Sequence, residues 1–172
     1  MRFELEFNKE IYNKQMDLLF DLAWKTKKDY YKNSQYLGII LVLVGIVVIY
    51  NRPNLFGFGL IILGLWNLIP FLYYYCKIKS IYKKLDIAKT IEGEFYENSI
   101  HVFEFTENSL VTNDGKILRC FNWNEFKIYS IIEDNLILIT QNMEPLILGE
   151  SEVGKQNFQE IISFVEKKIK IV

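Results

Sequence analysis

The chain has 172 residues, of which 51% are apolar and 16% aromatic, and its net charge is −1. This length limits it to one or two small domains. The two cysteines, Cys76 and Cys120, have neither metal-ligand spacing nor a disulfide framework. Residues 1–20 carry charges throughout and lack the apolar core of a signal peptide.

The charge is divided unevenly between the two halves. Residues 1–90 contain 13 Lys and Arg against 7 Asp and Glu, a net of +6, whereas residues 91–172 contain 7 against 14, a net of −7. A basic half suits an anionic membrane surface, and an acidic half is repelled by nucleic acid and by lipid phosphate. We therefore expect the lipid bilayer as one partner and no binding of nucleic acid.

Residues 1–32 predict a strand followed by an amphipathic helix. Residues 1–7 alternate apolar and polar side chains, which is typical of a half-buried strand. From about residue 9 to residue 31, apolar side chains recur at helical spacing. We expect the strand to join a sheet formed elsewhere in the chain, because a lone strand needs a partner.

Residues 33–76 predict a hairpin of two membrane helices. The apolar runs 36–50 and 55–76 carry no charge, and the second is long enough for a hydrocarbon core of about 30 Å. Between them, Asn51-Arg52-Pro53-Asn54 predicts a tight turn, because proline disfavours helical angles in the residue before it. The alternative, a buried hairpin of a soluble protein, would need a much larger domain to cover it.

Lysines predict the orientation of this hairpin. Four lysines in residues 25–32 precede the first run and four in residues 77–84 follow the second, whereas the turn carries only Arg52. The positive-inside rule then predicts a multi-pass protein of the cell membrane with both termini in the cytoplasm. The expected interfacial anchors are Tyr50, Tyr73, Tyr74 and Tyr75.

Glycine spacing predicts how the two helices meet. Glycines seven residues apart lie on one face of a helix, and small residues allow close approach in lipid. We therefore expect Gly45 near Gly57 and Gly59, and Gly38 near Gly64. The alternative is that glycine is simply common in membrane helices. The complete set of expected helix-packing residues, in which Asn67 supplies one interhelical hydrogen bond, is Gly38, Gly45, Gly57, Gly59, Gly64 and Asn67.

After the apolar block, we expect a juxtamembrane helix over residues 77–92 and a domain over residues 93–172. Alternation with period two predicts strands at 99–106, 109–121, 125–140 and 144–149, the middle two being hairpins.

Two three-residue stretches predict the turns of these hairpins. They are Asn113-Asp114-Gly115, whose residues are expected to supply positive φ angles, and Glu133-Asp134-Asn135. A C-terminal helix capped by Ser151 is expected to bury one apolar stripe, formed by Phe158, Ile161, Ile162, Val165 and Ile169. The predicted fold class is a membrane α-helical hairpin plus α+β, with a PH-like antiparallel barrel or sheet capped by this helix.

One segment resembles the bacterial YcxB-like family. The resemblance rests on about 50 residues around "FEFTENSLVTNDGKILRCFNWNEFKIYSIIEDNLILI", with an aromatic corner from Trp123 to Phe126. It implies two membrane spans ahead of a PH-like domain, and it implies no particular biochemical activity. Residues 146–150 depart from the family, which often has an Ile-Pro-Lys-like stretch there.

Sequence patterns for catalysis are absent. His101 is the only histidine and has no nucleophile near it in sequence, so we expect a structural role and no enzyme activity. No phosphate-binding loop or metal motif indicates a cofactor. Residues 93–150 contain three basic side chains against ten acidic ones, which makes binding of phosphoinositide-type lipid unexpected.

We expect a non-enzymatic scaffold or regulator that binds a protein or peptide partner at the cytoplasmic face, along a sheet edge. Trp123 and Phe126 are candidate partner-binding residues, but we favour a structural role in which they close the barrel at its corner. The alternative function is immunity or envelope defence, in which the membrane hairpin recognises a toxin.

Overall fold

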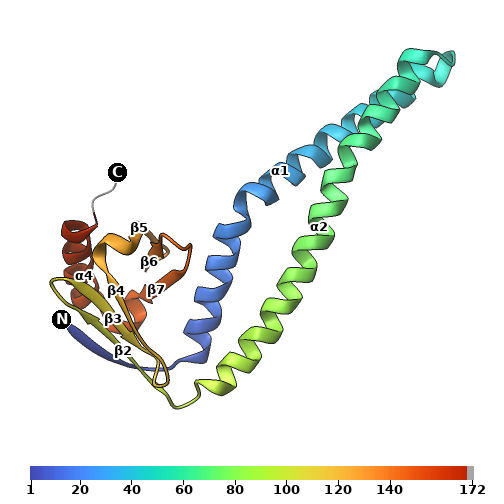
Figure 1. The fold of residues 1–172 in the computed structure, drawn as a ribbon. Coiled ribbons are helices and arrows are strands. Elements are labelled where there is room, and N and C mark those ends of the chain that lie inside the picture. Colours follow the sequence, from blue (N-terminus) through green and yellow to red (C-terminus); the bar gives the residue numbers. More distant parts are fainter. Residues whose placement is uncertain (170–172) are drawn as a thin grey trace. The chain divides into compact units, whose positions relative to one another are not determined.

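The computed structural model (Figure 1) describes residues 1–169, apart from the side chain of Asn51. The last expected segment, 93–172, therefore ends outside the described residues. The composition of the sequence predicted segment boundaries at residues 32, 76 and 92. Contacts between residues divide the chain differently. The strand at the N-terminus and the first turns of the helix after it belong with the carboxy-terminal domain.

The helical hairpin consists of two continuous helices, α1 (Lys9–Asn51) and α2 (Leu55–Phe95). Each apolar run forms one continuous helix with the amphipathic segment that flanks it. Asn54 caps α2, because its side-chain oxygen accepts the backbone N–H of Gly57 at 2.8 Å. The helices are separated only by residues 52–54, which confirms the predicted tight turn.

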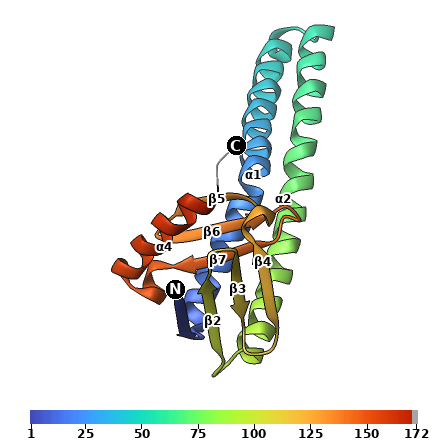
Figure 2. The same cartoon turned by 60° about the vertical axis from the view of Figure 1, so that its left-hand side comes forward.

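The carboxy-terminal domain contains two antiparallel sheets, with the orders β1-β2-β3-β4 and β5-β6-β7. In Figure 2 the strands of the second sheet run across those of the first. This arrangement confirms the α+β class predicted for the domain. The strands are β1 (Arg2–Glu6), β2 (Ile100–Phe105), β3 (Ser109–Asn113), β4 (Leu118–Asn122), β5 (Phe126–Ile132), β6 (Asn135–Thr140) and β7 (Pro145–Gly149).

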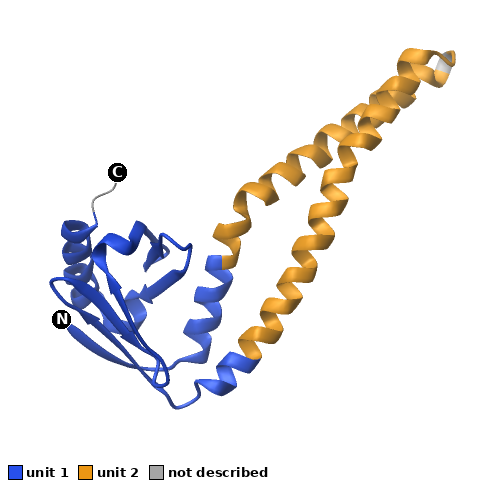
Figure 3. Ribbon diagram, in the orientation of Figure 1, with its two compact units in different colours: residues 1–19, 91–172 blue, residues 20–90 orange. Residues whose placement is uncertain are grey.

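The first strand of the chain joins this domain, as expected. β1 pairs antiparallel with β2, with Phe3 opposite Phe103. The two compact units are therefore residues 1–19 with 91–172, called unit 1, and residues 20–90, called unit 2 (Figure 3). Unit 2 is an insertion between two paired strands of unit 1.

The core of unit 1 lies between the sheets and helix α4 (Lys155–Lys168). The expected helical stripe supplies four buried side chains and one that is partly buried, Ile162. The helix start was predicted wrongly. Ser151 lies inside a separate four-residue helix, α3 (Glu150–Val153), and Gly154 ends that helix with φ 81°, a conformation that favours glycine.

The two hairpin turns differ in detail from the prediction. In the first, only Gly115 has positive φ; Asn113 and Asp114 instead accept backbone N–H groups with their side chains. In the second, Glu133 and Asp134 alone form the turn, with φ of 50° and 58°, and Asn135 already belongs to β6.

Two leucines of one hairpin test where this core lies. Leu110 of β3 is fully buried, whereas Leu118 of β4 is 70% exposed. Leu110→Ala is expected to destabilise unit 1 by about 2–5 kcal/mol, since it removes buried apolar surface and leaves a cavity. Hydrogen–deuterium exchange of β2 and β3 in the full chain measures this loss. Leu118→Ala is the matched control and should change protection little; equal effects of the two variants would contradict the described core.

Candidate functional site

The helices of unit 2 carry a long apolar surface that the described residues leave uncovered. Both α1 and α2 are long and apolar enough to cross a membrane. Only 17% of the most apolar window of α1 and 11% of that of α2 is buried. A core helix of a soluble protein would be mostly buried, so this exposure fits a helix pair surrounded by lipid.

Glycines bring the two helices into close contact at two levels. A Cβ added to Gly38 would lie 2.8 Å from the carbonyl oxygen of Gly64, and one added to Gly45 would lie 2.9 Å from that of Gly57. These are the pairs expected from the spacing. The expected contact between Gly59 and Gly45 is wrong, because a Cβ added to Gly59 would meet nothing within 4 Å.

Asn67 acts through its backbone rather than through its side chain. Its side-chain amide donates to the carbonyl of Leu63 in the same helix, at 2.9 Å. The interhelical bond is instead donated by the buried Ser34 hydroxyl of α1 to the backbone carbonyl of Asn67. The expected bond through the Asn67 side chain is therefore wrong, although a polar link forms at this level.

The expected anchor tyrosines lie at the two ends of the apolar runs. Tyr50 is 85% exposed beside the turn. At the other end, the Tyr73 and Tyr74 rings pack edge to face, with Lys77 over Tyr73 and Lys27 over Tyr74. Tyr75 stacks on Phe71. Aromatic rings next to lysines are typical of a membrane–water interface.

The glycine contacts give a direct test of helix packing. Gly64→Leu is expected to separate the helices, because a Cβ there would lie 2.7 Å from the Gly38 carbonyl oxygen. Gly59→Leu adds the same side chain in open space and is the matched control. Thermal unfolding in detergent should show a lower midpoint for Gly64→Leu alone. Equal midpoints for the two variants would contradict the described contact.

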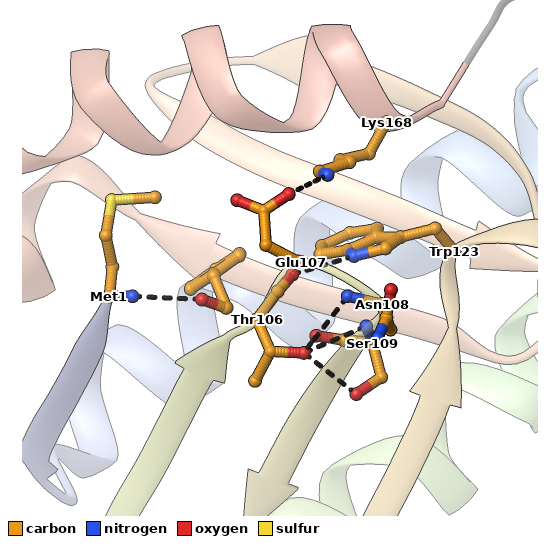
Figure 4. Close-up of polar contacts among 8 residues, drawn as sticks. Met1, Thr106, Glu107, Asn108, Ser109, Trp123 and Lys168 are labelled. Atoms are coloured by element: carbon orange, nitrogen blue, oxygen red, sulfur yellow. Dashed lines mark hydrogen bonds and ion pairs between the residues drawn. The ribbon is translucent and has the colours of Figure 1, made fainter.

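The corner residues of unit 1 lie in the core rather than on a binding surface. Trp123 is 7% exposed and Phe126 is 6% exposed. The Trp123 indole N–H donates to the Thr106 carbonyl at 3.0 Å (Figure 4). The Trp123 ring also packs against Phe105 and Phe164. The partner-binding interpretation of these two residues is therefore corrected, since neither ring is accessible, and their burial fits the closing of the corner.

His101 has the surroundings of a packed side chain. Its ring lies 5.5 Å from that of Phe7 and 5.4 Å from that of Tyr96, measured between centroids. Desolvation lowers the pKa of His101, and the charge of Asp114 opposes this shift. Asp114 already accepts hydrogen bonds from Tyr96 and from two backbone N–H groups of its turn. In the described part of the chain, no group of three or more His, Cys, Asp or Glu side chains could hold a metal ion.

A largely buried carboxylate links α1 to the second sheet within unit 1. Glu152 of α3 accepts hydrogen bonds from the Gly149 N–H and from the Gln15 side chain, both at 2.6 Å. Gln15 is buried and also donates to the Asn135 side chain at 3.4 Å. Burial raises the pKa of the Glu152 carboxyl, although both hydrogen bonds oppose that shift.

This carboxylate predicts a pH dependence of stability. Because the pKa in the folded state is raised, the stability contributed by Glu152 is fully present below the unfolded pKa of about 4.3 and is lost as pH rises through the folded pKa. Glu152→Gln should therefore gain stability relative to the unmodified chain as pH rises from about 4 to 7. Urea unfolding across this range measures the difference. Glu160→Gln, at an exposed position of α4, is the control; a constant difference for Glu152→Gln would contradict the burial of this group.

β5 presents a free strand edge. The two-residue turn with two positive φ angles makes Ile132 and Asn135 a hydrogen-bonded pair, and such pairs alternate along an antiparallel ladder. The N–H groups of Tyr129 and Ile131 therefore point away from β6. On that side the described residues supply no strand.

Apolar side chains flank this edge. Ile128 and Ile131 are each 44% exposed and lie on opposite faces of the sheet. The exposure of Ile128 does not follow from the sequence, because strict alternation would put it on the same face as the buried Phe126. A register shift between these two residues reverses the faces instead, and such a bulge has no clear sequence signal here.

Comparison with known proteins adds no relative: no family model, no curated protein and no solved structure matches this chain. The resemblance to the YcxB-like family therefore has no support from these comparisons.

Proposed function

We propose that this chain is a membrane-anchored, non-enzymatic scaffold or regulator whose unit 1 binds an extended peptide of a protein partner along the edge of β5. The free edge of β5, with its outward N–H groups and exposed isoleucines, is the observation that carries this proposal. The α1–α2 hairpin anchors unit 1 at the cell membrane with both termini in the cytoplasm.

The placement in the membrane is supported by exposure and charge. The apolar windows of both helices are largely exposed, and eight lysines flank them on the side of the chain ends against one arginine at the turn. The glycine faces are already occupied within the hairpin, since Gly38 meets Gly64 and Gly45 meets Gly57. This intramolecular packing favours an anchor over a toxin-recognising hairpin.

A PH-like fold of unit 1 is part of the proposal. Crossing antiparallel sheets of four and three strands, followed by a C-terminal helix, are the parts that such a fold requires. The resemblance of the corner at Trp123 to the YcxB-like family is in keeping with it. Fold alone does not establish function, so the binding role rests on the strand edge.

The edge of β5 suits a strand-forming peptide. An added strand would accept hydrogen bonds from Tyr129 and Ile131 and would continue the three-stranded sheet. Ile128 and Ile131 would pack against its apolar side chains on the two faces. The ten acidic side chains of residues 93–150, against three basic ones, favour a peptide that is apolar or basic rather than acidic.

Photocrosslinking in cells tests this function. A photoreactive amino acid is placed at Ile131 of the full chain, and in a matched chain at Leu118, the exposed leucine of the β4 edge. We expect the Ile131 probe to capture one protein partner and the Leu118 probe to capture none. Ile128→Lys should remove the adduct, because a charge on a strand edge opposes strand addition.

The same experiment is repeated with residues 33–76 replaced by an unrelated two-span anchor. The adduct should persist, since the proposal assigns recognition to β5. Loss of the adduct with the native spans would support recognition by the hairpin and overturn the proposal. An equal adduct from Leu118 would overturn the assignment to β5.

A further inference from the structure

A groove of about 760 Å³ lies within unit 2, between α1 and one face of α2. Tyr31 supplies the α1 side. The residues from α2 recur at helical spacing and so share one face. They include Tyr75, Cys76, Ile78, Lys79, Tyr82 and Lys83.

The groove begins where the apolar run of α2 ends, at Tyr75 and Cys76. At about 1.5 Å per residue, Lys79 lies about 5 Å further along the helix and Lys83 about 11 Å further. The polar headgroup layer of a bilayer extends about 5–8 Å beyond the hydrocarbon core, and lysine side chains reach along a helix by several ångströms. Both ammonium groups can therefore meet a lipid phosphate.

The two lysines in the groove are free to bind an anion. Among the described residues, neither Lys79 nor Lys83 forms an ion pair or lies over an aromatic ring. The one carboxylate among the described residues of the groove, Asp86 at its far end, lies 3.4 Å from Lys89, so two lysines face a single, paired acid. The groove is consequently positive where it meets the headgroup layer.

The walls of the groove are largely apolar and pack against neighbouring side chains. Ile78 is buried, and the Tyr82 ring packs edge to face against Phe20 at 5.1 Å between centroids. Tyr31 and Tyr75 both pack against Phe71, at 5.8 and 5.7 Å. Such walls would contact the glycerol and the first methylenes of an acyl chain, which free phosphate lacks.

We propose that this groove binds one anionic phospholipid, with Lys79 and Lys83 on its phosphate and the tyrosine walls against its glycerol and upper acyl chain. Basic pockets between membrane helices at this level are suited to such headgroups. The site is separate from the peptide-binding edge of β5. It rests only on the membrane insertion of the hairpin, which is part of the proposed function.

Lipid selectivity of the full chain tests the site. Native mass spectrometry is performed in detergent with equal amounts of phosphatidylglycerol and phosphatidylcholine. The unmodified chain should retain phosphatidylglycerol preferentially. Lys79→Gln/Lys83→Gln should lower this preference by about 30-fold, from the usual contribution of two lysines near an anionic lipid. The matched control, Lys25→Gln/Lys32→Gln, removes two exposed lysines of α1 outside the groove and should keep the preference.

The two exposed cysteines provide a second measurement in vesicles. Cys76 lines the groove, whereas Cys120 lies in β4 of unit 1. Phosphatidylglycerol in phosphatidylcholine vesicles should slow maleimide labelling of Cys76 relative to Cys120. This protection should disappear in the Lys79→Gln/Lys83→Gln chain.

Three results would overturn the lipid site: an unchanged preference in Lys79→Gln/Lys83→Gln, an equal loss in the control, or displacement of the lipid and protection of Cys76 by inorganic phosphate alone. Flotation with phosphatidylcholine vesicles separates this failure from that of the proposed function. A chain that does not float contradicts membrane insertion itself, whereas one that floats without selectivity contradicts only the lipid site.

Discussion

Pairing between β1 and β2 determines how this chain is organised. Phe3 lies opposite Phe103, the N-terminal amine donates to the Phe105 carbonyl, and the Phe7 N–H donates to the Ser99 carbonyl at 3.1 Å. These contacts join strands that are separated by both long helices. The helical hairpin must therefore leave and re-enter one sheet, which holds its two chain ends together. A hairpin with adjacent ends has an even number of spans, in keeping with both ends on one side of a membrane.

The first turns of α1 are part of unit 1 for a related reason. Gln15 is held by Glu152 and Asn135, and the Tyr12 hydroxyl donates to Glu92 near the end of α2. Desolvation and the neighbouring Glu92 carboxylate raise the pKa of Tyr12, so its hydroxyl stays protonated and remains a donor. Tyr12, Gln15 and Glu92 therefore tie the first turns of α1 and the last turn of α2 into unit 1.

The proposed peptide edge and lipid groove use opposite chemistry on separate units. β5 offers backbone N–H groups and isoleucines in an acidic domain, whereas the groove offers lysines and tyrosines at the end of an apolar helix. The charge split between the halves of the chain underlies this difference. An acidic domain is repelled by the lipid phosphates that the basic helices attract, which would leave the strand edge open to a protein.

The sequence alone determined the features that follow from local periodicity: two long apolar helices, the turn at Pro53, the strands and the stripe of α4. It could not determine features that depend on contacts between distant segments. For Trp123 and Phe126 the sequence favoured a structural role but left a binding role open, and only the two sheets packed around them decided it. Whether Gly59 and the Asn67 side chain face the other helix depended on helix rotation. Seven-residue spacing constrains that rotation only approximately. The bulge before Ile128 and the groove beside Tyr31 likewise arise only from tertiary packing, because one residue of register or one helix face decides which side chains are left uncovered.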